Sequence, residues 1–392
     1  MRLLPAGLAL GVLLAVAASL PVAAHKPITS PYTFAEDVLP ILRDRCGACH
    51  VQGGPAPMPL TTAEETVPWG ESIRLELIAG HMPPWSAMSG GKRLRHAEGL
   101  SARELNVLLT WVTGGTPPGD AKPTPAPAAG VEWALGTPDL TLALPETPVA
   151  ADQGEVTREI VLPLAPAARR PLRAVDLRPG TRSLVRSARI AVRSASHAPD
   201  NVEALVGLWV PGDQPVALPA GTAFAVPGDA ELVITIRLRK TWEHEREAMS
   251  DRSTLALYFA DAGARPIAAR AVGIAPAPPP PPPGRAPLSP SPVSTGVVTS
   301  ETLTTDTRIL AVYPTTAAAG ATITIDATPE GGLLQRVLEF SPQRGWERRY
   351  WLDQPLDLPR GTRLQTSVKF ERLSSAPTEG APVILNVVPS VP

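Results

Sequence analysis

The stretch Cys46-Gly47-Ala48-Cys49-His50 governs which fold the first third of the chain is expected to adopt. It is a C-x-x-C-H pattern, in which two thiols add to the vinyl groups of a haem and the adjoining histidine binds the iron. Zinc is the alternative for paired cysteines, but such sites use about four Cys or His ligands, and the chain has only these two cysteines. The motif therefore predicts one covalent haem c held by Cys46, Cys49 and His50.

Helical periodicity surrounds this motif. Apolar residues within 34–42 recur at helical spacing and lead into Cys46. Further along, Ser101-x-x-Glu104 is a capping box that opens an apolar helix over 105–112. Two such helices around a haem motif predict a small all-α monohaem cytochrome c domain over residues 25–115.

The second axial ligand of the iron has three candidates in this region. Met82 lies in the proline-stiffened stretch Gly-His-Met-Pro-Pro-Trp at 80–85, just before the last helix. A methionine ligand suits an electron-transfer haem, which favours Met82. Met58, which is nearer to the motif, and His81 remain open as alternatives.

The N-terminus predicts export. Residues 1–24 begin with Arg2, continue through an apolar run at 8–20 and end in small residues that favour cleavage after Ala24. This run is shorter than the roughly 20 apolar residues of a membrane span, and we expect no span later in the chain. A signal peptide over 1–24 and a soluble periplasmic protein are therefore expected.

Prolines divide the rest of the chain. Of 48 prolines, many cluster in a Pro/Ala linker at 116–130 and in a proline-rich linker at 275–295. The formal net charge of −1 predicts no attraction to nucleic acid.

Between and after these linkers the pattern is β. Short apolar runs alternate in side-chain character and are separated by Pro/Gly turns. The clearest runs are 184–192, 232–238, 253–259 and 321–326. We therefore expect an all-β region of paired, jelly-roll-like β-sandwiches, the first over 131–274 and the second over 296–392, in a multi-domain protein.

Four stretches carry a family resemblance. They are FAEDVLPIL at 34–42, the CGACH motif, GGPAPM at 53–58 and MPPW at 82–85. They resemble the cytochrome module that precedes bacterial copper type II, ascorbate-dependent monooxygenase-like proteins, whose relatives include peptidylglycine monooxygenase-like enzymes. Weaker similarity, in turns such as Arg178-Pro179-Gly180, extends over most of 34–372 and implies paired β-sandwiches.

The resemblance implies copper sites whose ligands are missing here. A His-His pair follows the Arg-Pro-Gly turn in the family, where this chain has Arg186 and Ser187. A His-x-His strand is replaced by Arg237 and Arg239, and the stretch 313–320, where the family has a methionine ligand, has neither His nor Met. Arginine stays protonated and cannot replace imidazole. We therefore expect no copper and no monooxygenase chemistry.

These observations predict a one-electron carrier rather than an enzyme, in which the degenerate β-region docks a redox partner protein or acts as a scaffold. The alternatives are a haem-dependent oxidoreductase with a residual active site in the β-region, and a sensor in which the haem reports redox state. Basic residues of the first β-region would attract an acidic partner if several shared one face, although scattered solvated positions are the simpler interpretation. They are Arg158, Arg169, Arg170, Arg173, Arg178, Arg182, Arg186, Arg189, Arg193, Arg237, Arg239 and Lys240.

Overall fold

The computed structural model describes residues 29–120, 133–196, 203–273, 296–315, 321–370 and 383–389. The expected signal peptide, most of the first linker and the proline-rich linker lie outside the described residues. Within the described residues, no helix combines the length and the apolar character needed to cross a membrane.

Beside two small two-stranded sheets, the first β-body has two main sheets that share one core. Their strand orders are β1-β10-β4 and β3-β8-β5-β6. Along β8 the side chains of Ile234, Ile236 and Leu238 are buried, whereas Arg237 and Arg239 lie on the opposite face because side chains alternate along a strand. The strands are β1 (Leu140–Ala143), β2 (Thr147–Val149), β3 (Glu155–Pro163), β4 (Leu172–Arg178), β5 (Val185–Ser194), β6 (Ala204–Trp209), β7 (Thr222–Ala223), β8 (Ala230–Arg239), β9 (Met249–Asp251), β10 (Thr254–Phe259) and β11 (Arg265–Pro266), with short helices η3 (Pro166–Ala168) and η4 (Trp242–His244).

The second β-body has sheets of order β12-β19-β14-β17 and β13-β18-β15-β16, again around a shared core. Its first strand, β12, precedes the proline-rich stretch, so the division between the two β-bodies falls before β12 and not at residue 275. The strands are β12 (Ala268–Val272), β13 (Gly296–Thr302), β14 (Thr307–Pro314), β15 (Ala321–Thr328), β16 (Gln335–Phe340), β17 (Tyr350–Leu358), β18 (Arg363–Phe370) and β19 (Val383–Pro389). Strands β5, β8, β10 and β15 confirm the four runs singled out in the sequence.

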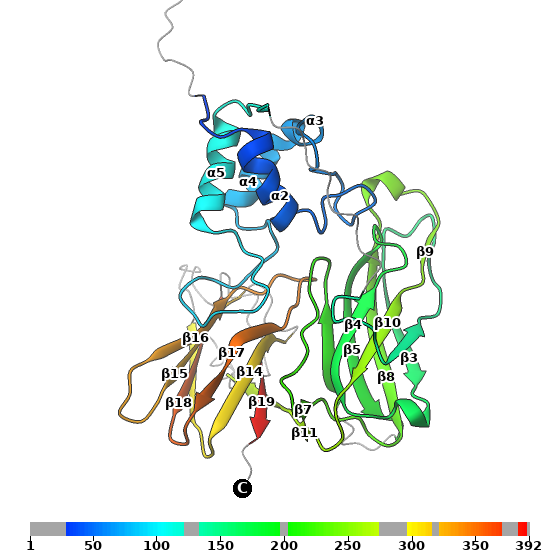
Figure 1. The fold of residues 1–392 in the computed structure, drawn as a ribbon, viewed down its shortest axis with the longest axis vertical. Coiled ribbons are helices and arrows are strands. Elements are labelled where there is room, and N and C mark those ends of the chain that lie inside the picture. Colours follow the sequence, from blue (N-terminus) through cyan, green and yellow to red (C-terminus); the bar gives the residue numbers. More distant parts are fainter. Residues whose placement is uncertain are drawn as a thin grey trace, which may run out of the picture.

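The N-terminal segment, residues 29–120, lies above the two β-bodies (Figure 1). A small core that includes Phe34, Leu108 and Trp111 holds its helices together. The capping box predicted at Ser101 and Glu104 is confirmed, since each side chain bonds the other residue's backbone N–H. The helices are η1 (Phe34–Val38), α2 (Leu39–Arg45), α3 (Ala63–Thr66), η2 (Val67–Trp69), α4 (Gly70–Ile78) and α5 (Ala102–Thr113).

The predicted fold class, an all-α cytochrome c domain followed by an all-β region, is wrong. Of the described residues, 40% lie in strands and 15% in helices. The helices are short, and residues 79–100, which we call the arm, contain none. The arm instead pairs with the second β-body through the bridges Ala87↔Phe340 and Leu94↔Leu352. The arm therefore belongs to the packing of a β-sandwich and not to a separate helical domain.

Candidate functional site

The CGACH motif forms a tight turn at the end of α2. The amide of Cys46 donates to Leu42 O at 2.8 Å, and the amides of Cys49 and His50 donate to Cys46 O at 3.0 and 2.8 Å. A Cβ at Gly47 would lie 2.5 Å from Arg43 O, so the turn requires glycine there. The turn brings two thiols and one imidazole to the same end of the helix.

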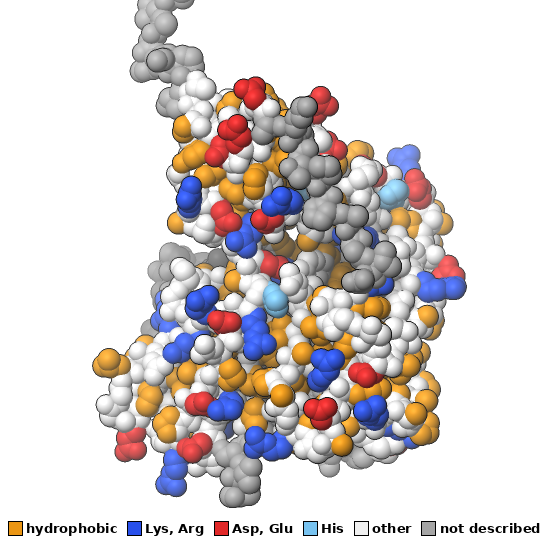
Figure 2. All heavy atoms as spheres, viewed as in Figure 1, with side chains coloured by type: hydrophobic (Ala, Val, Ile, Leu, Met, Phe, Trp, Pro, Cys, Tyr) orange, Lys and Arg blue, Asp and Glu red, His pale blue; other side chains and the backbone are white. Residues whose placement is uncertain are grey.

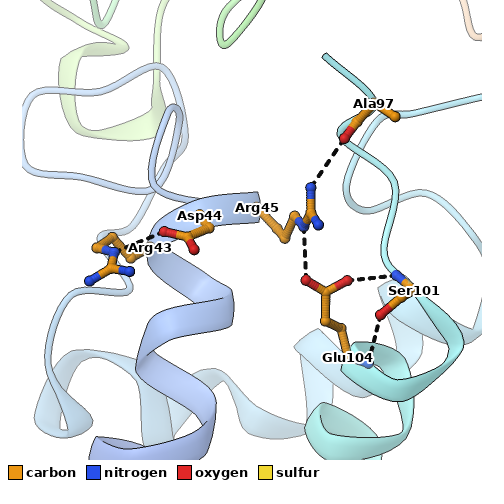
Figure 3. Close-up of polar contacts among 6 residues, drawn as sticks. All are labelled: Arg43, Asp44, Arg45, Ala97, Ser101 and Glu104. Carbon is orange, nitrogen blue, oxygen red and sulfur yellow. Dashed lines mark hydrogen bonds and ion pairs between the residues drawn. The ribbon is translucent and has the colours of Figure 1, made fainter. Parts of the chain in front are cut away.

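Arg45, the residue before the motif, fixes this turn to α5 (Figure 3). Its Nε donates to Glu104 Oε1 at 3.0 Å and its Nη1 donates to Ala97 O at 3.1 Å. Glu104 Oε2 accepts the amide of Ser101 at 2.7 Å. One carboxylate thus caps α5 and also orients the residue next to Cys46.

The motif opens onto a cavity of about 260 Å³ between the N-terminal segment and the β-bodies. This volume is just below the ~300–1,000 Å³ typical of small-molecule sites. Four parts of the chain line it. They are the motif with Arg45 and residues 55–57, the arm at Met82, Pro83 and Pro84, the arginines Arg186, Arg237 and Arg239 of the first β-body, and Gly345 and Trp346 before β17.

The motif also touches the first β-body directly. Cys49 Sγ lies 3.9 Å from Pro211 O, and a Cβ at Gly212 would lie 3.1 Å from the Cβ of Ala48. Near the same junction, Trp242 Nε1 donates to Pro57 O at 3.2 Å. These contacts close one side of the cavity around the motif.

The ring of His50 is held by one hydrogen bond to the backbone. Its Nδ1 lies 3.0 Å from Met58 O, and donation to this carbonyl leaves Nε2 as the nitrogen able to ligate. Burial lowers the pKa of His50, against the smaller opposite effect of the bond to Met58, so the ring is held neutral as ligation requires.

Of the three candidates for a second axial ligand, Met82 is the one that lines the cavity. Its side chain is 38% exposed, which is unusual for a methionine that merely fills a core gap. The side chain of Met58 packs against the helical core, and His81 lies at 3.1 Å from Glu76 on an exposed surface. Met82 is thus the one candidate of the three that borders the cavity of the motif.

Both thiols are protonated at neutral pH. Burial raises the pKa of Cys46 to about 12 and that of Cys49 to about 11. A thiol redox pair or a metal–thiolate site needs thiolates, usually with a lowered pKa. The two thiols are therefore not activated for thiol redox chemistry.

A buried charge cluster joins all three parts of the molecule behind this cavity. Arg348 Nη1 contacts Glu98 of the arm at 2.5 Å and also contacts Asp213, which follows β6. The side chain of Arg348 is only 3% exposed. On the surface, Figure 2 shows blue and red side chains at the lower edge of the N-terminal segment, where it meets the β-bodies. Nothing in the sequence pattern indicated this cluster.

The cluster predicts a dependence of stability on pH. Burial raises the pKa of Asp213 to about 7, although the charge of Arg348 opposes this. Between the ordinary aspartate pKa of ~4 and about 7, the folded state then binds more protons than the unfolded state, so this group makes the free energy of unfolding rise as pH falls. We expect urea unfolding at about pH 8 and about pH 5.5 to show this change, and Asp213→Asn to reduce it rather than abolish it, because burial also raises the pKa of the neighbouring Glu98. Identical pH profiles for both proteins would contradict the assignment.

The arginines at the cavity were singled out in the sequence for another reason. Arg186, Arg237 and Arg239 stand where the resemblance would place copper ligands. They lie at one cavity rather than scattered over solvated faces, which the sequence could not show because it requires the pairing of β5 with β8.

Comparisons with known proteins assign no family. No family model and no curated protein matches the sequence. Solved structures similar to the fold include an allantoicase, at 9% identity and a TM-score of 0.19 over 56% of this chain and 75% of that chain. A CBM22 tandem domain from Paenibacillus barcinonensis shows 10% identity and a TM-score of 0.17, over 67% of this chain and 99% of that one. Scores this low carry no argument, so function rests on the cavity.

Proposed function

We propose that this protein is a periplasmic electron carrier that holds one haem c in the cavity. Cys46 and Cys49 would attach the macrocycle, and His50 and Met82 would ligate the iron. The observation that supports this most is convergence, since these four side chains come from the motif and the arm and line one cavity. When bound, the haem would supply a one-electron iron couple.

The residues around the cavity would hold this site in one geometry. The bond to Met58 O orients the ring of His50. Prolines at 83 and 84 restrict the loop that presents the Met82 thioether. Pro57 and Trp346 line the same cavity. Two filled axial positions leave no open site for a substrate, which favours electron transfer over catalysis.

The two methionines provide a matched test of this proposal, with protein produced in a host that attaches haem c. We expect a low-spin optical spectrum, the weak long-wavelength band of methionine-ligated ferric haem, and iron without copper. Met82→Ala should abolish that band, because it removes the thioether. Met58→Ala should keep it, because the backbone carbonyl that orients His50 remains.

Three outcomes would count against this function. Stoichiometric copper in the purified protein, or a high-spin haem that binds carbon monoxide readily, would favour an oxidoreductase. Loss of the band in Met58→Ala but not in Met82→Ala would move the axial ligand to Met58.

A further inference from the structure

Three arginines of the first β-body face the CGACH motif across the cavity. Arg237 and Arg239 lie on the outer face of β8, and Arg186 lies on the adjacent strand β5. The pairing of β5 with β8 shifts register between Val185 and Ser187, so Arg186 occupies a β-bulge. Bulges re-aim side chains next to functional sites. The β-bulge therefore occurs at Arg186, which lines the cavity.

These arginines carry more positive charge than their neighbours neutralise. Within the described residues, Glu155 is the one carboxylate in ion-pair contact with them, at 2.6 Å from Arg237 and 3.9 Å from Arg239. Glu347 acts on Arg237 only through its charge. Arg186 Nη1 donates to Ser183 O at 2.9 Å and has no ion pair among the described residues. Partly buried cations without counter-charges favour an anionic ligand.

The backbone next to Arg237 and the burial of Arg186 also bear on how these arginines are held. Gly345 has φ +80°, a conformation that favours glycine, and the guanidinium of Arg237 packs against it. Burial lowers the pKa of Arg186 to about 10, with Arg239 the next contribution. The like charges are thus held together at a cost that a bound anion would offset.

We propose that Arg186, Arg237 and Arg239 bind the propionate carboxylates of the haem attached at Cys46 and Cys49. This inference rests on the proposed function and adds to it. A haem carries two propionates, and guanidinium groups such as those of Arg186 and Arg239 pair with carboxylates through hydrogen bonds. Arg237 would add its charge beside them, because its Nε and Nη2 already donate to Glu155. The thiols and the arginines belong to different walls of one cavity. The first β-body then forms part of the cofactor's environment and sets its reduction potential.

The reduction potential of the holoprotein tests this proposal. Arg186→Gln should lower the midpoint potential, because removing a nearby cation stabilises the more positive ferric state. Arg186→Gln combined with Arg239→Gln should lower it further. Arg186→Lys should keep the midpoint potential close to that of the wild type, because lysine retains the positive charge. Arg158→Gln is the matched control, since Arg158 lies exposed on neighbouring strand β3 and does not line the cavity.

The outcomes separate this inference from the function on which it rests. If Arg186→Gln leaves the potential equal to that of Arg158→Gln while the haem stays low-spin, the propionate contact is wrong and the electron carrier stands. If the wild-type protein attaches no haem, both proposals fail.

A thermal unfolding cycle gives a second readout that does not involve potential. Arg186→Gln should lower the Tm of the holoprotein, whereas in the haem-free Cys46→Ala/Cys49→Ala background it should leave the Tm unchanged or raise it. An equal loss in both backgrounds would overturn the proposal, since it would assign Arg186 to the protein scaffold. Added acetate or phosphate that raises the Tm of the holoprotein only when Arg186 is present would also overturn it, because the arginines would then be open to a free anion.

Discussion

Replacing both Cys46 and Cys49 by alanine is expected to abolish covalent haem attachment, so that no haem remains with the denatured chain. The physical reason is that a thioether forms only from a thiol, and the chain has no other cysteine. Axial ligation by His50 and Met82 alone would be lost on denaturation. The mass of the denatured polypeptide measures the effect directly, because the wild-type chain should carry the additional mass of one haem.

A single substitution supplies the control for this experiment. Cys46→Ala keeps the Cys49 thiol, so the denatured chain should still carry haem through one thioether bond. A wild-type chain whose mass matches its polypeptide alone, after maturation in a competent host, would end the haem proposal.

The second large effect is expected at Arg348. Arg348→Met should reduce the free energy of unfolding by about 3–5 kcal/mol, because it leaves Glu98 and Asp213 close together without their shared cation. It also removes a cation–π contact, since the guanidinium carbon lies 5.6 Å from the centre of the Trp85 ring. Urea unfolding near neutral pH measures the change.

Arg93, an exposed arginine of the arm, gives the comparison. Arg93 pairs with Asp353 at 3.8 Å, but its side chain is 92% exposed. Arg93→Met should therefore cost less than about 1 kcal/mol. Equal losses in the two variants would show that the buried cluster does not hold the three parts together. In the Arg348→Met background, Glu98→Gln with Asp213→Asn should recover part of the loss, because neutral amides are cheaper to bury unpaired.

The sequence predicted those elements whose signals are local. Ser101 and Glu104 stand at the spacing of a capping box, and α5 begins directly after Ser101. Alternation over 232–238 predicts β8 because burial on one face of a sheet repeats every second residue. The CGACH motif located the cavity for the same reason, since its spacing is a property of five adjacent residues.

What the sequence did not predict depends on partners far along the chain. The arm has no repeating apolar pattern, and its place on the second β-body comes from bridges such as Ala87↔Phe340. We therefore expected an all-α domain, whereas the arm packs against the second β-body. The Arg348 cluster and the arginines at the cavity are likewise products of strand pairing and loop docking, which no local spacing encodes.

The reach of the arm has a consequence for how the molecule is made. Lys92 Nζ donates a hydrogen bond to Gln335 Oε1, 243 residues further along the chain. The arm can therefore dock only after most of the chain has been synthesised. Chains emerge from the N-terminus first, and such distant pairings form late in folding. In the proposed holoprotein, the CGACH thiols would therefore be open to haem attachment before the arm has docked on the second β-body. The haem would be attached first and enclosed by the rest of the protein afterwards. It would then not need to enter a finished cavity.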